Sequence, residues 1–217
     1  MATPRASHTA TPLPGGRVLI IGGCVVDHCD GTAGADSELF DPVTGRFTPG
    51  PPLSAPRAGH TATALADGRV LVVGGFSGER LPPLAGTELY DPATGRFTPA
   101  GTVSVRRGQT ADEPQARLAR TERFDPRSGT FRPGPPMSEP RYKISEAVLS
   151  LADGRVVIAG GYGVDTYADG ELRALGTVPG PERQFPAVAA LPDGRVLIAG
   201  GYDDRTFLTA TAVVLQL

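Results

Sequence analysis

The residues best suited to chemistry lie in one short loop of the sequence, CVVDHCDGTAGAD. This loop holds Cys24 and Cys29, with His28, Asp27 and Asp30 beside them. Thiolate, imidazole and carboxylate groups are all zinc ligands. The spacing of the two cysteines around one adjacent histidine is not that of a closed zinc site, and no second cluster completes it. We therefore expect no metal and no cofactor, and we interpret the cysteines as an incidental thiol pair that forms a disulfide only in an oxidising compartment.

The other two histidines, His8 and His60, occupy the same position in two copies of a repeated segment. The aligned residues in the remaining copies are Gln109, Glu146 and Pro186. A shared catalytic ring would not tolerate these replacements. We interpret the histidines as hydrogen-bonding groups at the start of a strand.

Arginines recur before the first strand of each copy, and aromatic residues recur after a pair of glycines. The arginines are Arg5, Arg57, Arg106, Arg141 and Arg183, and the aromatic residues are Phe76, Tyr162 and Tyr202. Because successive strands reverse direction, both sets should lie on the same side of the sheets, the side of the loops that follow the glycine pairs. Guanidinium groups bind carboxylate or phosphate bidentately, so the arginines could bind an anion there. The alternative, which we favour, is that each arginine binds carbonyls and carboxylates of its own repeat.

The repeated segment is clearest in HTATALADGRVLVVGG, residues 60–75, which has near copies at 8–23, 148–161 and 188–201. HTATAL alternates in polarity as a strand does, Asp67-Gly68 is a hairpin turn signal, and RVLVV is an apolar run typical of a buried strand. TELYDPATGRF follows and predicts a second hairpin, so each full unit should be a four-stranded antiparallel sheet. The glycine pairs that mark the repeat are Gly22-Gly23, Gly74-Gly75, Gly160-Gly161 and Gly200-Gly201.

The units are not equal in length. Asp41 and Asp91 lie 50 residues apart, whereas Asp91 and the matching Asp125 lie only 34 apart. The third unit therefore lacks its inner hairpin, and the fifth ends before an outer strand. We divide residues 1–217, taken as one domain, into units at about 4–53, 54–104, 105–138, 139–184 and 185–217.

These glycine pairs, the RAGHTA segment before the first strand, and Phe40 or Tyr90 followed by Asp-Pro resemble kelch repeats. The resemblance covers essentially the whole chain, with Phe47, Phe97 and Phe131 where the family usually has tryptophan. It implies an all-β, kelch-type β-propeller of about five blades, with the third blade shortened and the last incomplete. A closed five-bladed ring, an open array and a fragment of a longer propeller all remain open.

Charge and composition exclude several partners. The formal net charge of −2 gives no general attraction to nucleic acid or to membranes. No run of about 18 apolar residues is present, so we expect no membrane span. The first residues lack the apolar core of a secretory signal, which predicts a cytoplasmic protein as encoded, or a secreted one if the N-terminus is truncated.

The resemblance favours a non-catalytic binding or scaffold module whose loops contact another protein. The sequence shows no catalytic constellation, so we do not expect an enzyme. Two alternatives are kept. The first is a carbohydrate-binding or sugar-modifying propeller similar to sialic-acid epimerases. Some kelch propellers resemble copper-containing galactose oxidases instead, but we find no Tyr, Cys and His copper site of that kind in the sequence. The second is a truncated remnant of a larger kelch protein with no activity of its own.

Overall fold

The computed structural model describes residues 1–26, 29, 33–78, 83–103, 117–141, 144, 147–180, 182–203 and 205–216. The chain divides into two compact units. Unit 1 comprises Met1–Arg106 and Phe124–Arg132, and unit 2 comprises Arg107–Arg123 and Pro133–Leu217. Within the described residues, no helix is both long and apolar enough to cross a membrane.

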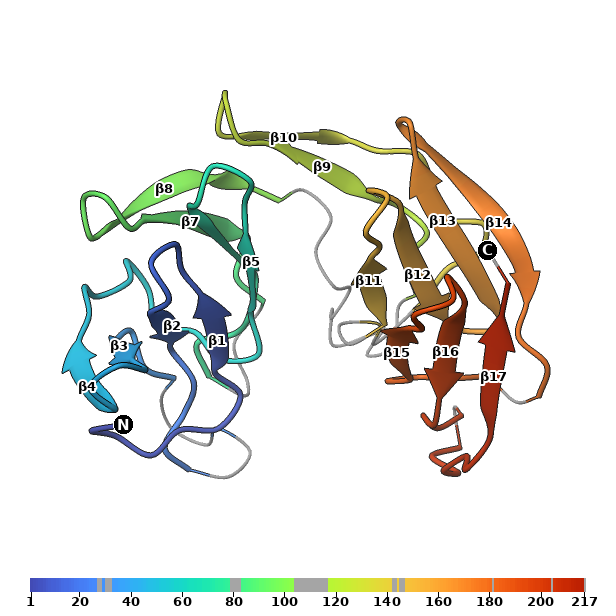
Figure 1. Cartoon of the computed structure of the whole chain (residues 1–217), viewed down its shortest axis with the longest axis horizontal. Helices are drawn as coiled ribbons and strands as arrows, with labels where there is room; N and C mark the ends of the chain where they lie inside the picture. Colours follow the sequence, from blue (N-terminus) through green and yellow to red (C-terminus); the bar gives the residue numbers. More distant parts are fainter. Residues whose placement is uncertain are drawn as a thin grey trace. The chain divides into compact units, whose positions relative to one another are not determined.

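Unit 1 contains two four-stranded antiparallel sheets, each with its strands in chain order (Figure 1). The first sheet is β1 (Thr9–Pro12), β2 (Val18–Ile21), β3 (Ser37–Asp41) and β4 (Arg46–Pro49). The second is β5 (Thr61–Ala64), β6 (Val70–Val73), β7 (Gly86–Asp91) and β8 (Arg96–Thr102). The four strands that the sequence predicts for a full unit are therefore present in both.

Unit 2 contains one four-stranded sheet and one three-stranded sheet. The four-stranded sheet is β11 (Val148–Ser150), β12 (Val156–Gly160), β13 (Gly163–Ala168) and β14 (Glu171–Thr177). The three-stranded sheet is β15 (Ala187–Ala190), β16 (Val196–Ala199) and β17 (Ala212–Leu215). In the described part of the fifth repeat, the outer strand is absent, as the sequence indicates.

The third repeat contributes only a hairpin to the described structure, β9 (Glu122–Asp125) and β10 (Thr130–Pro133). Phe124 and Phe131 of this hairpin pack against Leu71, Leu89 and Ala100. The described residues thus form four blades and one hairpin, and the fold is an all-β propeller type. The expected count of five blades is not confirmed.

The apolar run of each repeat forms the most buried strand. Val70 and Val72 of β6 pack with Leu19 and Ile21 of β2 in the core of unit 1. Val157 of β12 and its counterparts Val196 and Ile198 of β16 do the same in unit 2. Burial of these branched side chains between neighbouring sheets is the main stabilising contribution within each unit.

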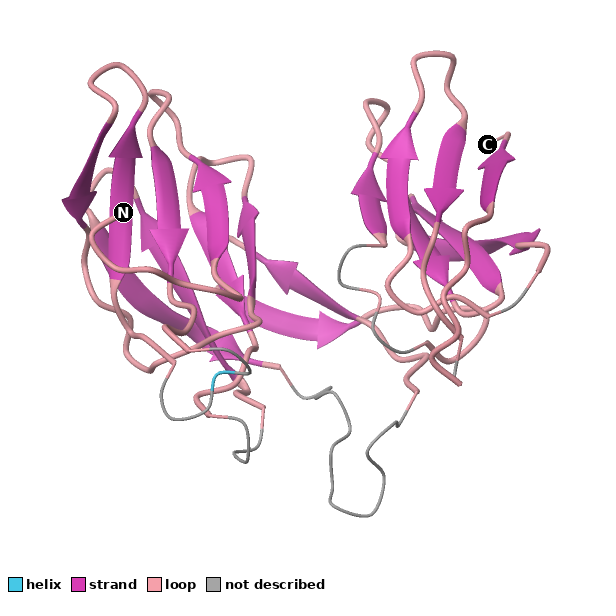
Figure 2. Cartoon of the chain, turned by 90° about the horizontal axis from the view of Figure 1, so that it is seen from below, coloured by secondary structure: helices cyan, strands magenta, loops and turns pink. Residues whose placement is uncertain are grey.

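Both kinds of hairpin turn are fixed by an aspartate. In the ADGR turn, Asp67 Oδ1 accepts from the backbone N–H of Arg69 at 3.1 Å, and Gly68 has φ +87°. In the DPATG turn, Asp91 Oδ1 accepts from the N–H of Ala93 at 2.8 Å. Within each unit, these turns lie at one end of the sheets, and longer loops lie at the other (Figure 2). We call the end with the longer loops the loop side of that unit.

The glycine pairs end the buried strands on the loop side. Gly75 has φ +85°, and a Cβ there would lie 2.7 Å from the carbonyl oxygen of Ala58. Gly201 has φ +95°, and a Cβ there would lie 2.7 Å from the carbonyl oxygen of Gln184. Glycine is required because the segment that carries the repeat arginine pairs directly against this backbone.

Candidate functional site

The repeat arginines turn inward rather than toward solvent. Arg57 is 2% exposed and donates to Gly74 O at 3.0 Å and to Glu88 Oε1 at 2.7 Å. Arg5 makes the same pair of contacts with Gly22 O at 2.7 Å and Glu38 Oε1 at 2.9 Å. Each arginine therefore joins the segment before the first strand to the glycine pair and to the third strand of its own sheet.

This set of contacts, here called the anchor, recurs in unit 2. Arg141 pairs with an acid there, whereas Arg183 has a threonine in its place. Arg141 donates to Gly160 O at 2.9 Å and pairs with Asp165, and both side chains are buried. Arg183 donates to Gly200 O and Thr211 O, each at 3.0 Å, and to Thr211 Oγ1 at 2.6 Å. Arg106 lies outside the described residues.

The carboxylate of this anchor occupies one register position. Glu38 lies opposite Ile20, Glu88 opposite Val72, and Asp165 opposite Ile158. Each of these apolar partners lies two residues before the glycine pair of its repeat. Our sequence analysis did not single out these acids, although the SELFDP and TELYDP segments display two of them. In the fifth repeat, Val213 occupies the same position opposite Ile198. The described arginines thus have partners within their own repeats, and a role in binding a ligand stays a prediction.

The histidines also have a structural place. His60 is 5% exposed, and its Nε2 lies 2.8 Å from Thr9 Oγ1 of the neighbouring sheet. Burial lowers the pKa of His60 from 6.5 to about 4, and the positive charge of Arg57 adds to the effect. His60 is therefore neutral at physiological pH and joins β5 to β1.

The two cysteines are joined in a disulfide, Cys24–Cys29. This corrects the expectation of an incidental thiol pair. Cys24 and Cys29 are buried with Ala33 and Ala58, and Phe76 packs against the cluster. His28, Asp27 and Asp30 lie outside the described residues. Among the residues that the structure describes, no group of His, Cys, Asp or Glu could hold a metal ion.

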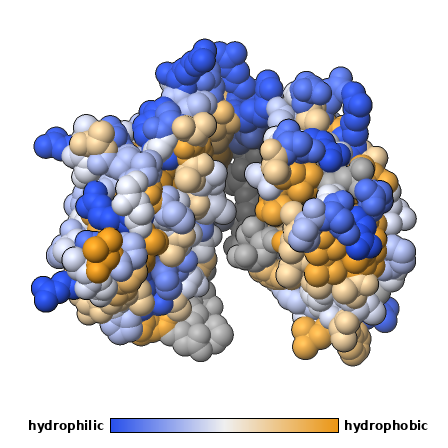
Figure 3. Space-filling model, in the orientation of Figure 1, coloured by the Kyte–Doolittle hydropathy of each residue, from blue (hydrophilic) through white to orange (hydrophobic). Residues whose placement is uncertain are grey.

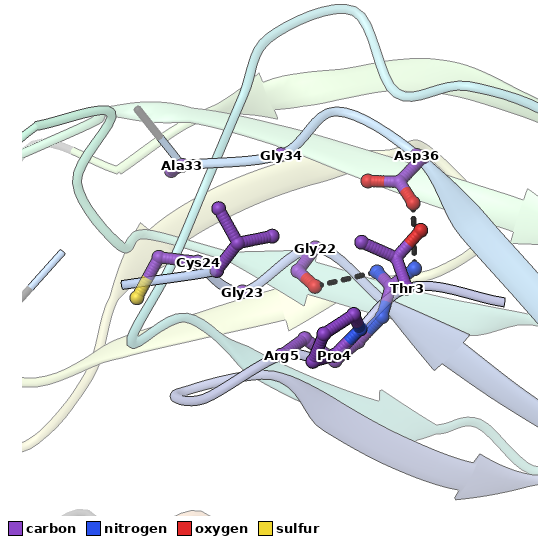
Figure 4. A pocket seen from close by; sticks show the side chains of 10 residues that line it. Thr3, Pro4, Arg5, Gly22, Gly23, Cys24, Ala33, Gly34 and Asp36 are labelled. Atoms are coloured by element: carbon purple, nitrogen blue, oxygen red, sulfur yellow. Dashed lines mark hydrogen bonds and ion pairs between the residues drawn. The ribbon is translucent and has the colours of Figure 1, made fainter. Parts of the chain in front are cut away.

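A pocket of about 110 Å³ lies beside this disulfide on the loop side of unit 1 (Figure 4). It is lined by Thr3, Pro4, Arg5, Gly22, Gly23, Cys24, Val25, Ala33, Gly34 and Asp36. Arg5 forms one wall, held by Gly22 O and by Asp36 Oδ2 at 2.5 Å. Arg5, one of the residues expected on the ligand face, lines this pocket, together with Gly22 and Gly23 of the repeat signature.

The three predicted aromatic residues differ in exposure. Phe76 is half-buried against the disulfide cluster, whereas Tyr162 is 49% exposed and donates its N–H to Glu139 Oε1 at 2.8 Å. Tyr202 is half-buried, and its ring lies 5.9 Å from that of Phe185. Phe185 is a residue that the sequence analysis missed.

Phe185 stands where the backbone is left-handed in other repeats. Ser7, Gly59 and Phe185 each follow the repeat arginine by two residues, with φ of +53°, +61° and +50°. Glycine adopts this conformation without strain, but a bulky side chain there is unusual and costs about 1–2 kcal/mol. The fifth repeat therefore holds an aromatic residue, 39% exposed, at an energetic cost.

Comparison with known proteins agrees with this architecture. Residues 56–104, which span the second four-stranded sheet, match the model of the Kelch motif. The resemblance to kelch repeats is confirmed for this motif, and the sheets have a propeller-like arrangement. No curated protein sequence matches the chain.

Two solved structures share the fold at low sequence identity. One is described as "Structure of YjhT"; it is 13% identical, with a TM-score of 0.70, over 99% of this chain and 82% of the other. The second is a novel fungal alcohol oxidase of the AA5 family in complex with copper. It is 17% identical, with a TM-score of 0.71, over 97% of this chain. This chain spans 51% of the oxidase, and at such identities the likeness concerns the fold alone.

The buried Arg57–Glu88 pair predicts a large effect of a small substitution. Glu88→Gln leaves the Arg57 charge without its counterion in the protein interior, and we expect a loss of about 3 kcal/mol in the free energy of unfolding. The control is Asp67→Asn, which breaks the half-exposed pair with Arg69 and should cost less than about 1 kcal/mol. Urea denaturation measures both, and equal losses would contradict the anchor.

The His60 pKa predicts a pH dependence of stability. The unfolded chain binds a proton near pH 6.5 and the folded chain only near 4, so stability is full above pH 6.5 and falls as the pH drops toward 4. The loss amounts to about 3 kcal/mol. Urea denaturation between pH 7.5 and 4 should show a smaller loss for His60→Gln than for the wild type. His8→Gln should keep most of the dependence, because burial of His60 is its main cause.

Reduction of the disulfide should destabilise unit 1. A cross-link that closes so short a loop contributes about 2 kcal/mol. We expect reductant to lower the free energy of unfolding by this amount in the wild type and not in Cys24→Ala/Cys29→Ala. A thiol titration that finds two free thiols in the native protein purified under oxidising conditions would contradict the disulfide.

Proposed function

We propose that the chain is a non-catalytic binding module that contacts another protein through its loop side. The proposal is carried by four residues of the fifth repeat, here called the aromatic patch: the exposed Phe185, Phe207 and Leu208 and the half-buried Tyr202. Phe207 and Leu208 are 68% and 86% exposed. Apolar and aromatic groups gathered on a surface are typical of protein interfaces.

The residues of the aromatic patch lie on neighbouring segments. Tyr202 pairs with Leu208 across the loop between β16 and β17, and the N–H of Asp203 donates to Phe207 O at 3.2 Å. The Phe185 ring lies against that of Tyr202. Figure 3 shows apolar atoms at the lower end of this blade, where the β16–β17 loop lies in Figure 1. The strained backbone of Phe185 supports a binding role, because strain without a structural benefit concentrates at functional positions.

The sugar-modifying alternative receives less support from the described residues. It would use the repeat arginines on the loop side, and those described bind within their own repeats. The pocket of unit 1 is about 110 Å³, whereas small-molecule sites have volumes of about 300–1,000 Å³. Its size suits a single side chain of a protein partner.

The remnant alternative is also less supported. The shortened third repeat keeps its aromatic pair, with the rings of Phe124 and Phe131 5.0 Å apart, and both pack against the second sheet. The hairpin thus contributes to the core of unit 1. The Cys24–Cys29 disulfide favours an oxidising compartment as the place where the protein works, over the cytoplasm.

Substitutions at Phe185 separate stability from binding. Because the backbone is left-handed, Phe185→Gly should be about 1 kcal/mol more stable than Phe185→Ala. Both should weaken binding of a protein partner at least about tenfold, since both remove the ring. Urea denaturation gives the stabilities, and titration calorimetry with a partner identified by cross-linking in the source cells gives the affinities.

The matched control is Val43→Ser, which changes a 92% exposed apolar residue in the turn between β3 and β4. This variant should bind the partner as the wild type does. A partner that binds Phe185→Gly and the wild type equally would refute the proposal that the aromatic patch is the contact surface.

A further inference from the structure

The charged groups at the pocket beside the disulfide determine which charge of ligand it can bind. Arg5 contributes one positive charge, and Asp36 and Glu38 both lie against it, at 2.5 and 2.9 Å. Burial raises the pKa of Glu38, but hydrogen bonds from Ala2 N–H and from Arg5 outweigh it and hold the pKa below its usual value. Two acidic side chains thus lie against the single guanidinium group. An anionic ligand is therefore disfavoured.

The pocket also offers a free acceptor. Asp36 Oδ2 is engaged by Arg5, whereas Oδ1 has no hydrogen-bond partner among the described residues. The Asp36 side chain is 55% exposed, and Figure 4 shows its carboxylate beside Gly34 at the pocket. A Cβ on Gly34 would overlap Oδ1, so glycine at this position gives the carboxylate its room.

The unpaired Nε–H of Arg5 does not point to an anion. The same atom is unpaired and buried in Arg57 and Arg183, so it is a property of the repeat arginine. The remaining walls are mostly apolar: Pro4, Cys24, Val25 and Ala33 line the pocket beside the carboxylate. Val25 is 59% exposed and stands at the rim for an incoming side chain.

We propose that this pocket binds a lysine side chain of the protein partner, with the ammonium on Asp36 Oδ1 and the methylene stem against Pro4 and Val25. A lysine combines an apolar stem with a compact cationic head that donates hydrogen bonds. A volume of about 110 Å³ leaves room for one extended side chain. An arginine fits less well, because its paired N–H groups require both oxygens of a carboxylate and Oδ2 is already engaged.

The inference rests on the proposed function, since it names one group that the partner presents to the loop side. It can be tested without the partner. The ¹⁵N-labelled full chain is titrated with a terminally blocked Gly-Lys-Gly peptide, and the same peptide with norleucine, acetyl-lysine or arginine in the central position is titrated in parallel. We expect saturable shifts of the amides of residues 22–25 and 33–36 with lysine, and binding at least about tenfold weaker with the others.

Two variants and a control locate the effect. Asp36→Asn should weaken lysine binding at least about tenfold while Arg5 keeps Glu38 and Gly22 O, so the fold is preserved. Gly34→Ala should do the same without a change of charge, because its Cβ displaces the carboxylate. Asp193→Asn removes an equivalent exposed acid, paired with Arg195 at 2.7 Å in unit 2, and should leave binding unchanged.

Equal binding of norleucine or acetyl-lysine would overturn the role of the ammonium, and preferred binding of arginine would overturn the assignment to lysine. An undiminished affinity in Asp36→Asn would place the site elsewhere. Absence of any lysine binding refutes the pocket but not the binding module, whose test depends on Phe185 in unit 2.

Discussion

The buried arginine is the interaction on which each repeat depends. A guanidinium group taken out of water costs several kcal/mol unless a counterion and hydrogen-bond acceptors replace the solvent. In the second repeat, Arg57 donates hydrogen bonds to Glu88 Oε1 and to Gly74 O, and these acceptors come from two different segments of the sheet. The segment before the first strand, the end of the buried strand and the start of the third strand must therefore meet at one point. The glycine pair follows from the same constraint, since any Cβ at Gly75 would push the arginine segment away.

A consequence is that the most regular residues of the chain are the least available for recognition. The described repeat arginines are buried and direct their hydrogen bonds to groups of their own sheets, and Glu38, Glu88 and Asp165, which pair with three of them, are buried as well. Groups that face solvent on the loop side are those that depart from the repeat. Asp36 stands where the second repeat has Gly86, and Phe185 stands where that repeat has Gly59. Specificity on this architecture then comes from single replacements on a fixed frame.

Much of the fold could be predicted from the sequence because the repeat encodes it locally. Alternating HTATAL, the Asp67-Gly68 turn and the apolar RVLVV run specify a hairpin by short-range rules, and the short spacing between Asp91 and Asp125 revealed the reduced third repeat. The site could be predicted only in part. Whether Arg57 faces solvent or a carboxylate depends on the register between β6 and β7, which pairs Val72 with Glu88. The Cys24–Cys29 disulfide was left conditional on an oxidising compartment, because two cysteines in a short loop carry no signal of compartment.

The fifth repeat shows how far the anchor can be weakened. Val213 replaces the acid, so among the described residues the charge of Arg183 is met by two carbonyls and the hydroxyl of Thr211. Polar neutral groups offset a buried charge less completely than a carboxylate does, and this blade also bears the strain of Phe185. Two unfavourable features in one repeat, next to the exposed Phe207 and Leu208, concentrate the energetic cost where the aromatic patch lies. A site that must rearrange around a partner is drawn from the less stable end of a structure, and both features are expected to lower the stability of the blade that bears the aromatic patch.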